Sequence, residues 1–383
     1  MMMMIDNQGS PQHVWWPFHE TVWNGLGTAD FIFPFFLFIM GSAVAMALKR
    51  AAWSASPVGV CRDRAVWIKV ARRSVALFGL GLLANLQGTN FEFGKLRIMG
   101  VLQRLGLCYG LVAVLYLTLP PLGQRIAVVL GAGLYLVIMY AVDVPDGCGD
   151  GKLTPYCNGG AYIDRSVFGR SNMMWPNDPE GLTSTLTATV TTFAGLELGR
   201  ILVNAPRAPA HMLPRDAQSF VHMQAKMVAV AWAALSLMAV VISLALLPVM
   251  QFSKKRYTVN FALMTAGCGG LLLAGLYAAM DMPGFQRAPL VVAARKLGQP
   301  LVWIGCNPLA VFLGMLELEL VLMDNVKVSL NGERVSLWHW LYVKAFASWM
   351  SPSLASSAMA GAVLALWWLV AWIMYRRQWF LKL

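Results

Sequence analysis

Long runs of apolar residues recur along the whole chain, and this feature restricts its fold more than any other. Several windows contain eighteen or more residues with almost no charge, enough α-helix to cross a hydrocarbon core about 30 Å thick. Only 13% of the 383 residues are charged, whereas a soluble domain has roughly 25%. The sequence therefore predicts an all-α, polytopic transmembrane bundle of about ten helices.

Hydropathy predicts nine spans after a short apolar stub at residues 1–5, which we expect to be a truncated first helix. No polar block or Pro/Ser-rich linker separates the spans, so we expect residues 1–383 to form a single transmembrane domain. No signal peptide and no repeat of fixed period are apparent. The expected spans lie near residues 29–49, 66–86, 99–119, 124–143, 183–203, 226–249, 258–280, 300–323 and 355–375.

The formal net charge of +12 would suggest a nucleic-acid partner for a soluble protein, but here Lys and Arg lie mostly at the ends of apolar spans. We therefore expect no nucleic acid and read the charges as setting membrane orientation. The loop at 50–65 and the C-terminus are rich in basic residues and are expected in the cytoplasm. The opposite side, the lumen or exterior, then contains His19 and the segments 144–182 and 324–354. The triplet Lys254-Lys255-Arg256 also lies on that side and weakens the difference in Lys and Arg content between the two sides.

The longest polar insertion is the 144–182 segment, which we expect to be an irregular, ordered loop because it is rich in Gly and Pro. Loops of this length in compact proteins are often functional. Cys148 and Cys157 lie in it, and a disulfide between them is expected if the loop faces an oxidising compartment. The other four cysteines lie in or beside apolar spans or a basic loop and are expected to act as small hydrophobic residues.

A few polar side chains could carry chemistry. His19 lies ten residues before the span at Ala29 and could serve as a base near neutral pH, or it could be an interfacial residue within an aromatic belt. Asp178 and Glu180 precede a span, where acids commonly cap a helix but could also hold a substrate amine. Ionisable and polar groups within spans are functional candidates by default, and here they are Asp30, Gln103, Arg104, Glu197, Asn307, Glu317 and Glu319.

A structural explanation exists for these groups as well. Arg97 or Arg104 could neutralise Asp30 or Glu92 in a buried pair. The sequence contains no Walker A loop, no dinucleotide fingerprint, no His-Glu-x-x-His and no Cys-x-x-Cys, so ATP-driven transport and zinc hydrolysis lose support and no metal is expected.

Several motifs together resemble the heparan-α-glucosaminide N-acetyltransferase family. The first is His19-Glu20-Thr21-Val22-Trp23-Asn24-Gly25, followed by the block from Ala29 to Gly41. Further matches follow in the family's order: Arg97-Ile98-Met99-Gly100-Val101-Leu102-Gln103-Arg104, Tyr162-Ile163-Asp164-Arg165, Asp178-Pro179-Glu180-Gly181, Gly305-Cys306-Asn307-Pro308 and Tyr375-Arg376-Arg377-Gln378-Trp379-Phe380. These motifs cover nearly the whole chain.

The resemblance implies a multipass transferase that takes acetyl from cytosolic acetyl-CoA, its co-substrate, and delivers it to the amine of a terminal glucosamine of heparan sulfate on the lumenal side. It implies a lysosomal or other endomembrane location in a eukaryote and the plasma membrane in a bacterium. The family's catalytic His matches His19, and its assisting Asn is matched by Asn7. His19 stands four residues before Trp23, where the family usually has three.

Further roles follow from this resemblance as expectations. Asp30, Arg97, Gln103, Arg104 and Asn307 are expected to bind substrate or cofactor, with the arginines near the thioester carbonyl. Asp178 and Glu180 are expected to bind the amino sugar or orient His19. Membrane lipid and a glycan acceptor are the expected partners, and the family includes homodimers. Two rival interpretations stay open: a secondary transporter of amino sugars, and a truncated, inactive paralogue.

Overall fold

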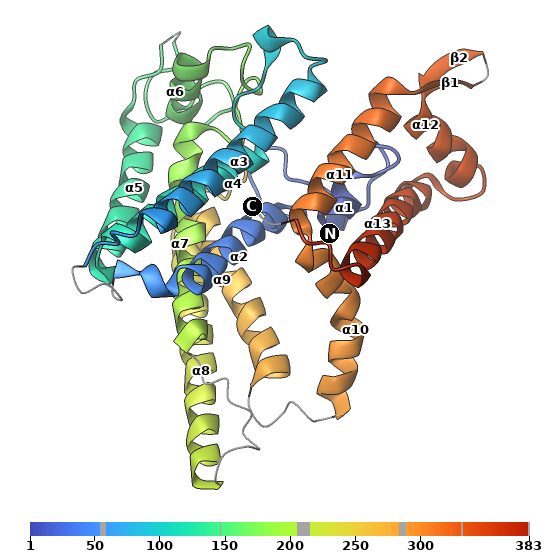
Figure 1. Cartoon of the computed structure of the whole chain (residues 1–383). Coiled ribbons are helices and arrows are strands. Elements are labelled where there is room, and N and C mark those ends of the chain that lie inside the picture. The colour runs from blue at the N-terminus through green and yellow to red at the C-terminus, as the bar shows by residue number, and fades with distance from the viewer. Residues whose placement is uncertain (54–58, 146, 205–214, 283–288, 331, 382–383) are drawn as a thin grey trace. The chain divides into compact units, whose positions relative to one another are not determined.

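The fold is almost entirely α-helical (Figure 1). The computed structural model describes residues 1–53, 59–145, 147–204, 215–282, 289–330 and 332–381, without the side chains of 215–220, 222 and 290. Within this part of the chain the strands form one short antiparallel hairpin, β1 (Lys327–Leu330) with β2 (Glu333–Ser336). The predicted all-α class is confirmed.

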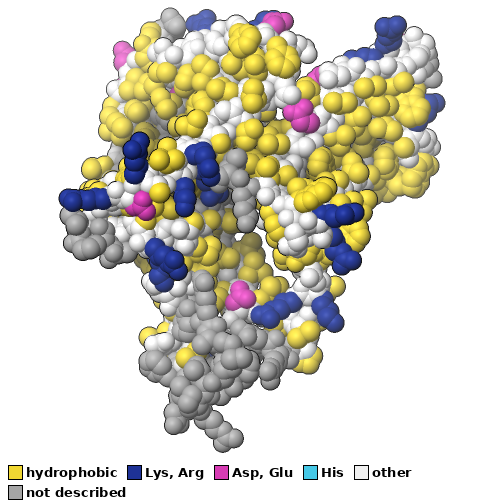
Figure 2. All heavy atoms as spheres, viewed as in Figure 1, with side chains coloured by type: hydrophobic (Ala, Val, Ile, Leu, Met, Phe, Trp, Pro, Cys, Tyr) yellow, Lys and Arg dark blue, Asp and Glu magenta, His cyan; other side chains and the backbone are white. Residues whose placement is uncertain are grey.

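Seven described helices are long and apolar enough to cross a membrane, and a bent pair adds an eighth. The chain is therefore a multi-pass membrane protein. Figure 2 shows hydrophobic side chains over much of the visible surface, as a lipid-facing protein requires. The seven helices lie at Ala29–Ala47, Val101–Thr118, Pro121–Ala141, Leu182–Asn204, Met223–Ala245, Val259–Asp281 and Pro352–Arg376.

Two of the predicted spans differ from the helices that the structure contains. The span expected at 66–86 is a helix, α3 (Arg64–Gly88), but it is not among the seven because Lys69, Arg72 and Arg73 interrupt its apolar run. The span expected at 300–323 is not one straight helix: α10 (Pro289–Cys306) and α11 (Pro308–Leu320) form a bent pair with an angle of 72°. Pro308 lacks an N–H and disfavours helical geometry at the residue before it, which leaves Asn307 at φ −133° and ψ 48°.

The chain divides into two compact units, and each contains candidate spans. Unit 1 comprises Met1–Glu20, Gly27–Ile32 and Ala293–Leu383. Unit 2 comprises Thr21–Leu26 and Phe33–Val292.

Unit 2 is built around α7 (Leu182–Asn204), which packs against α4 (Val101–Thr118), α5 (Pro121–Ala141) and α9 (Val259–Leu276) (Figure 1). All seven hydroxyl side chains on α7 are buried, and three of them bond within the helix. Thr189 Oγ1, for example, donates to Thr185 O at 2.8 Å and Thr192 Oγ1 to Ala188 O at 3.2 Å. Small, internally satisfied side chains let neighbouring helices approach closely. The most extensive other contacts are those of α3 with α4, and of α8 (Arg215–Ala245) with α9.

The contact between α2 (Ile32–Ala47) and α7 depends on glycine. A Cβ on Gly41 would lie 1.8 Å from Thr192 O, and one on Gly195 would lie 1.9 Å from Phe38 O. Ser42 Oγ donates to Gly195 O across the same contact at 2.9 Å. The two backbones therefore touch, which only residues without a Cβ permit.

Unit 1 contains α1 (Met2–Asp6), α11, α12 (Leu337–Leu341), the hairpin and α13 (Pro352–Arg376). Its core is formed by Trp338, Tyr342, Ala355, Met359 and Val363. Ser356 on α13 holds the segment after α1: its Oγ donates to Gln8 Oε1 at 2.9 Å and accepts from Ser10 N at 3.1 Å.

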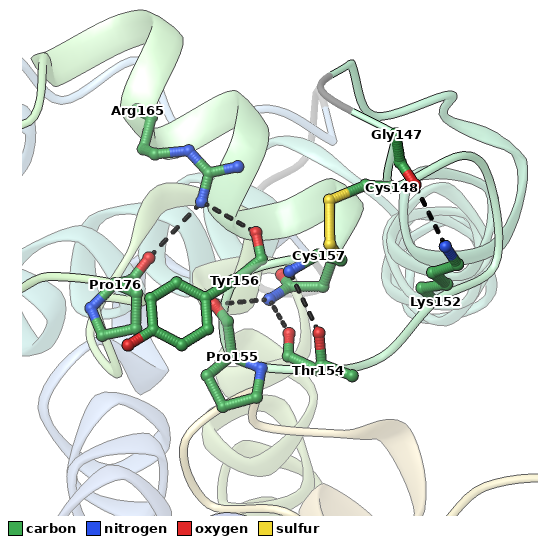
Figure 3. Close-up of a disulfide and its surroundings, with 10 residues drawn as sticks. Gly147, Cys148, Lys152, Thr154, Pro155, Tyr156, Cys157, Arg165 and Pro176 are labelled. Atoms are coloured by element: carbon green, nitrogen blue, oxygen red, sulfur yellow. Dashed lines mark hydrogen bonds between the residues drawn. A yellow bond between two sulfur atoms is a disulfide. The ribbon is translucent and has the colours of Figure 1, made fainter.

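The polar 144–182 segment is not wholly irregular, because residues Gly159–Phe168 form helix α6. Asn158 caps α6 by accepting from Ala161 N at 2.7 Å, a start signal that the expectation of a loop overlooked. The Cys148–Cys157 disulfide is present (Figure 3). Arg165 of α6 donates to the carbonyls of Tyr156 and Pro176, so helix and loop form one ordered cap at this end of α5 and α7.

Candidate functional site

Buried charges gather in unit 2 where the 172–181 segment leads into α7. Arg97 binds Asp178 with two parallel bonds, Nε to Oδ2 at 3.0 Å and Nη2 to Oδ1 at 2.6 Å, and binds Glu180 through Nη2 to Oε2 at 2.5 Å. Asp178 also accepts from the backbone N–H groups of Met174 and Glu180, both at 3.0 Å. Arg97 thus fixes the two acids that the sequence singled out.

The surroundings of Arg97 stabilise its charged guanidinium. Burial alone would lower the pKa of its guanidinium, but the bonds and charges of Asp178 and Glu180 outweigh burial and raise that pKa. Glu92, the other partner considered from sequence, is paired with Lys95 at 2.6 Å. The Arg97–Asp178–Glu180 group therefore holds the entry to α7 in place.

Arg104, on α4, is only 1% exposed, and the hydrogen-bond acceptors of its Nη2 are neutral oxygens. Its Nη2 donates to Pro179 O at 2.7 Å, to Gly181 O at 3.2 Å and to Ser184 Oγ. The guanidinium also lies 5.4 Å from the ring centroid of Tyr257 and 5.9 Å from that of Phe33, distances at which cation–π attraction operates. Arg104 therefore caps the carbonyls that precede α7.

Asp164 of α6 reaches the same helix start. Its Oδ1 accepts from Leu182 N at 2.9 Å and Thr183 N at 3.4 Å, so it satisfies two N–H groups of the first turn of α7. A Cβ at Gly181 would lie 1.8 Å from Asp164 Oδ2, so only glycine admits this approach. Burial raises the pKa of the Asp164 carboxyl to about 6, although its two backbone donors oppose the rise.

Arg256 approaches from the turn before α9 and is 4% exposed. Its Nη2 donates to Asn24 Oδ1 at 2.7 Å, and its guanidinium lies 5.6 Å from the ring centroid of Trp23. Burial lowers the pKa of Arg256. Arg256, Lys255, Asp164, Asn177 and Asp178 line a small cavity of about 10 Å³, room for about one water.

A second, larger cavity of about 240 Å³ lies at the opposite end of unit 2, where α2, α4 and α7 end and α5 begins. Its polar lining includes Lys49, Tyr116, Gln124 and Arg200. Arg200 bonds Glu197 and Gln124 and lies 4.9 Å from the ring centroid of Tyr116. Figure 2 shows Lys and Arg side chains gathered where α2 ends and α3 begins.

The two residues expected to act in catalysis lie in unit 1. His19 is exposed, and its Nε2 lies 2.9 Å from Val14 O. A carbonyl oxygen only accepts, so Nε2 carries the hydrogen and Nδ1 keeps its lone pair. Asn7 is fully buried at the end of α1: its Nδ2 donates to Met3 O at 3.1 Å, and its Oδ1 has no partner among the described residues.

The other candidates serve different local structures. Asp30 Oδ2 accepts from Gly27 N at 2.9 Å in unit 1, and Gln103 packs against Gly81 and Gly100 in unit 2. Asn307 donates to Trp379 O and accepts from Leu381 N, both at 2.9 Å, and so joins the α10–α11 bend to the C-terminal segment. Within the described part of the chain, no group of His, Cys, Asp and Glu is placed to hold a metal ion.

Comparison with known proteins finds two curated relatives that are similar to part of the chain. No family model matches the chain. The heparan-α-glucosaminide N-acetyltransferase of Homo sapiens is 31% identical over 252 residues, and that of Mus musculus is 29% identical over 252 residues. Each match covers 53% of this chain and 37% of the relative, so the chain spans well under half the length of the relatives it matches.

Over about half of its length the chain is similar to these heparan-α-glucosaminide N-acetyltransferases.

The structure brings four of the predicted site residues into one cluster, Arg97, Arg104, Asp178 and Glu180. Sequence reasoning missed Asp164 and Arg256 as site residues. Asp164 was quoted only as part of a motif. Arg256 was visible as the end of a basic triplet on the side otherwise poor in Lys and Arg, and that exception to the charge bias was the usable signal.

Proposed function

We propose that this protein is a transmembrane N-acetyltransferase that moves acetyl from cytosolic acetyl-CoA to the amine of a terminal glucosamine, of the heparan sulfate type, on the lumenal side. The observation that carries the proposal is the match to the human and mouse heparan-α-glucosaminide N-acetyltransferases. Activity, acceptor and compartment are proposals, because the match covers only 37% of those relatives.

The arrangement of unit 2 supports a reaction that uses both membrane faces. The basic 240 Å³ cavity lies at the N-terminal end of α5, and the Asp164–Arg256 cluster lies toward the other end of that helix. The 21 residues of α5 span about 31 Å at a rise of about 1.5 Å per residue, close to the thickness of a hydrocarbon core. The phosphates of the donor meet Lys49 at the cytoplasmic end, and the pantetheine arm carries the thioester inward.

His19 supplies the proton acceptor. The sugar ammonium must lose a proton before its nitrogen attacks the thioester carbonyl; a C–N bond then forms and the C–S bond to CoA breaks. Nδ1 of His19 has the lone pair to take that proton, or to carry the acetyl group transiently before the amine attacks. The buried Oδ1 of Asn7 is an acceptor still available within unit 1 for a donor in the reacting complex.

The two buried arginines Arg97 and Arg104 hold the segment before α7 in place. Arg97 is committed to Asp178 and Glu180, so these acids secure the lumenal entry of α7. Arg104 holds the carbonyls of Pro179 and Gly181 and adds positive charge beside the small cavity.

The test is acetyl transfer from labelled acetyl-CoA to a glucosamine-terminated acceptor by the purified protein in detergent or liposomes. We expect His19→Ala to lower turnover by roughly 10²-fold or more. His339→Ala, which removes another exposed His of unit 1, is the matched control and should retain wild-type turnover. Equal turnover by wild type and His19→Ala would refute the catalytic assignment; no transfer by the wild type, together with glucosamine flux that needs no acetyl-CoA, would refute the enzyme in favour of a transporter.

A further inference from the structure

Arg256 differs from the other buried arginines of unit 2 in what surrounds it. Arg97 has two carboxylates, and Arg104 has three oxygen acceptors and two aromatic faces. The guanidinium of Arg256 has one neutral acceptor, Asn24 Oδ1, and one aromatic face, Trp23; its Nε, like that of Arg104, has no partner among the described residues. Its five N–H donors are the least satisfied of the three.

The turn that carries Arg256 is firmly held, so this position is not a fraying end. Ser253 Oγ donates to Trp23 O at 2.5 Å, Asn177 Nδ2 donates to Lys255 O at 3.0 Å, and Tyr135 Oη donates to Arg256 O at 3.1 Å. Three separate parts of unit 2 therefore fix the backbone of residues 253–256. The side chain is presented at a fixed place without a protein anion to neutralise it.

Physical chemistry indicates what is missing. Burying an arginine is unfavourable unless an anion or several strong acceptors compensate it, and the lowered pKa of Arg256 has this cause. An oxyanion accepts a hydrogen bond roughly twice as strong as a neutral amide oxygen does. Asn24 is exposed, so its side chain can turn away and let an incoming oxyanion replace Oδ1 as the acceptor.

We propose that Arg256, with Asn24 and Trp23, forms a binding subsite for an anionic group, the carboxylate or sulfate of an acidic sugar in the acceptor. This inference rests on the proposed function. The site lies at the end of unit 2 that carries the disulfide-linked cap, through the bond from Trp23 Nε1 to Leu153 O at 2.9 Å. Lys255 lies beside Arg256 on the small cavity, which Asp164 and Asp178 also line. The subsite makes the enzyme prefer acidic acceptors over neutral ones.

The experiment compares kcat/KM for two disaccharides with a terminal glucosamine, one linked to a uronic acid and one to glucose, with a third bearing sulfate in place of the carboxylate. The wild type should favour the anionic acceptors at least tenfold, and Arg256→Gln should bring the ratio close to one, mainly through KM. Arg170→Gln is the matched control, because Arg170 is an exposed arginine at the same end of unit 2 that lies over Trp175; it should keep the wild-type ratio. An Arg256→Gln protein with the wild-type ratio overturns the inference.

Asn24→Asp separates binding from a purely structural role. A carboxylate at position 24 would pair with Arg256 permanently, so we expect higher thermal stability together with weaker binding of the anionic acceptors, by tenfold or more. This variant also replaces Arg256→Gln if the latter does not fold. Stronger or unchanged selectivity for the uronic acid in Asn24→Asp would contradict the subsite.

A binding measurement distinguishes failure of this inference from failure of the proposed function. Calorimetric titration with the N-acetylated uronic acid disaccharide and its neutral counterpart needs no turnover. If the wild type transfers no acetyl group yet binds the acidic disaccharide at least tenfold more tightly, and Asn24→Asp loses that preference, the subsite stands and the enzymatic proposal fails. Equal binding of the two disaccharides by the wild type overturns the subsite.

Discussion

The Asp164 carboxyl is the residue whose protonation the fold most clearly perturbs outside the spans. It is 3% exposed, and burial raises its pKa from 3.8 to about 6. Because the pKa is raised on folding, the native state favours the protonated acid. The contribution to stability is complete below about pH 4 and is lost as the pH rises through about 6, with a magnitude on the order of 2–3 kcal/mol.

We therefore expect Asp164→Asn to flatten this dependence. The amide oxygen can still accept from Leu182 N and Thr183 N, while the charge that becomes buried above pH 6 is absent. Thermal unfolding midpoints in detergent between pH 4 and pH 7.5 should fall less for Asp164→Asn than for the wild type. Asp143→Asn, at an exposed acid beside the same cap, is the control; if its profile and that of Asp164→Asn both follow the wild type, the assignment to Asp164 is wrong.

Individual residues also show how much of the candidate site the sequence predicted. Charged and polar groups in an apolar context identified Arg97, Arg104, Asp178 and Glu180 as important, and these do cluster. Their partners could not be inferred, because the pairs are separated by 75 to 83 positions and nothing local encodes such contacts. Arg256 stands out in the sequence only as the end of a basic triplet, because its role depends on the absence of a carboxylate partner, which the packed structure reveals.

At the level of helices, the close contact between α2 and α7 at their glycines gives a specific prediction. Gly195→Ala would place a methyl group 1.9 Å from Phe38 O, so α2 and α7 must separate and lose the bond from Ser42 to Gly195. We expect a loss of roughly 1–3 kcal/mol, the usual range for overpacking.

Gly131→Ala provides the matched control for that substitution. It lies within α5, another candidate span, and a Cβ there meets nothing within 4 Å. Its stability should match or slightly exceed that of the wild type, because Ala has the higher helix propensity. The measurement is the thermal unfolding midpoint of the two purified variants in the same detergent. Equal midpoints would show that α2 and α7 can separate without loss of stability.

Helices were easier to predict than the breaks in them. Apolar length alone located the seven candidate spans, because a bilayer admits few alternatives. It failed at Asn307, where a proline-induced bend interrupts an apolar run, and at α6, which is too short and too polar for a hydropathy window to detect. In both places a local signal existed, Pro308 in one and the capping Asn158 in the other, but uniform hydrophobicity or loop-like composition concealed it.

For the whole molecule, the orientation of the spans decides whether the two polar sites of unit 2 face different compartments. The positive-inside rule places the Lys49 end in the cytoplasm, and α5 and α7 then carry the Cys148–Cys157 cap to the lumenal or exterior side. A disulfide is stable only in an oxidising compartment, which agrees with that placement. Two independent physical arguments thus favour one orientation.

Single reporter cysteines test it in a background where the four free cysteines are replaced by alanine. Arg170→Cys and Arg62→Cys both introduce an exposed thiol, the first beyond α6 and the second between α2 and α3. In intact cells with the protein at the surface, a membrane-impermeant maleimide should label Arg170→Cys at once and Arg62→Cys only after permeabilisation. The reverse pattern would place the basic cavity outside, where acetyl-CoA is absent, and a donor drawn from the cytosol would no longer be compatible with the fold.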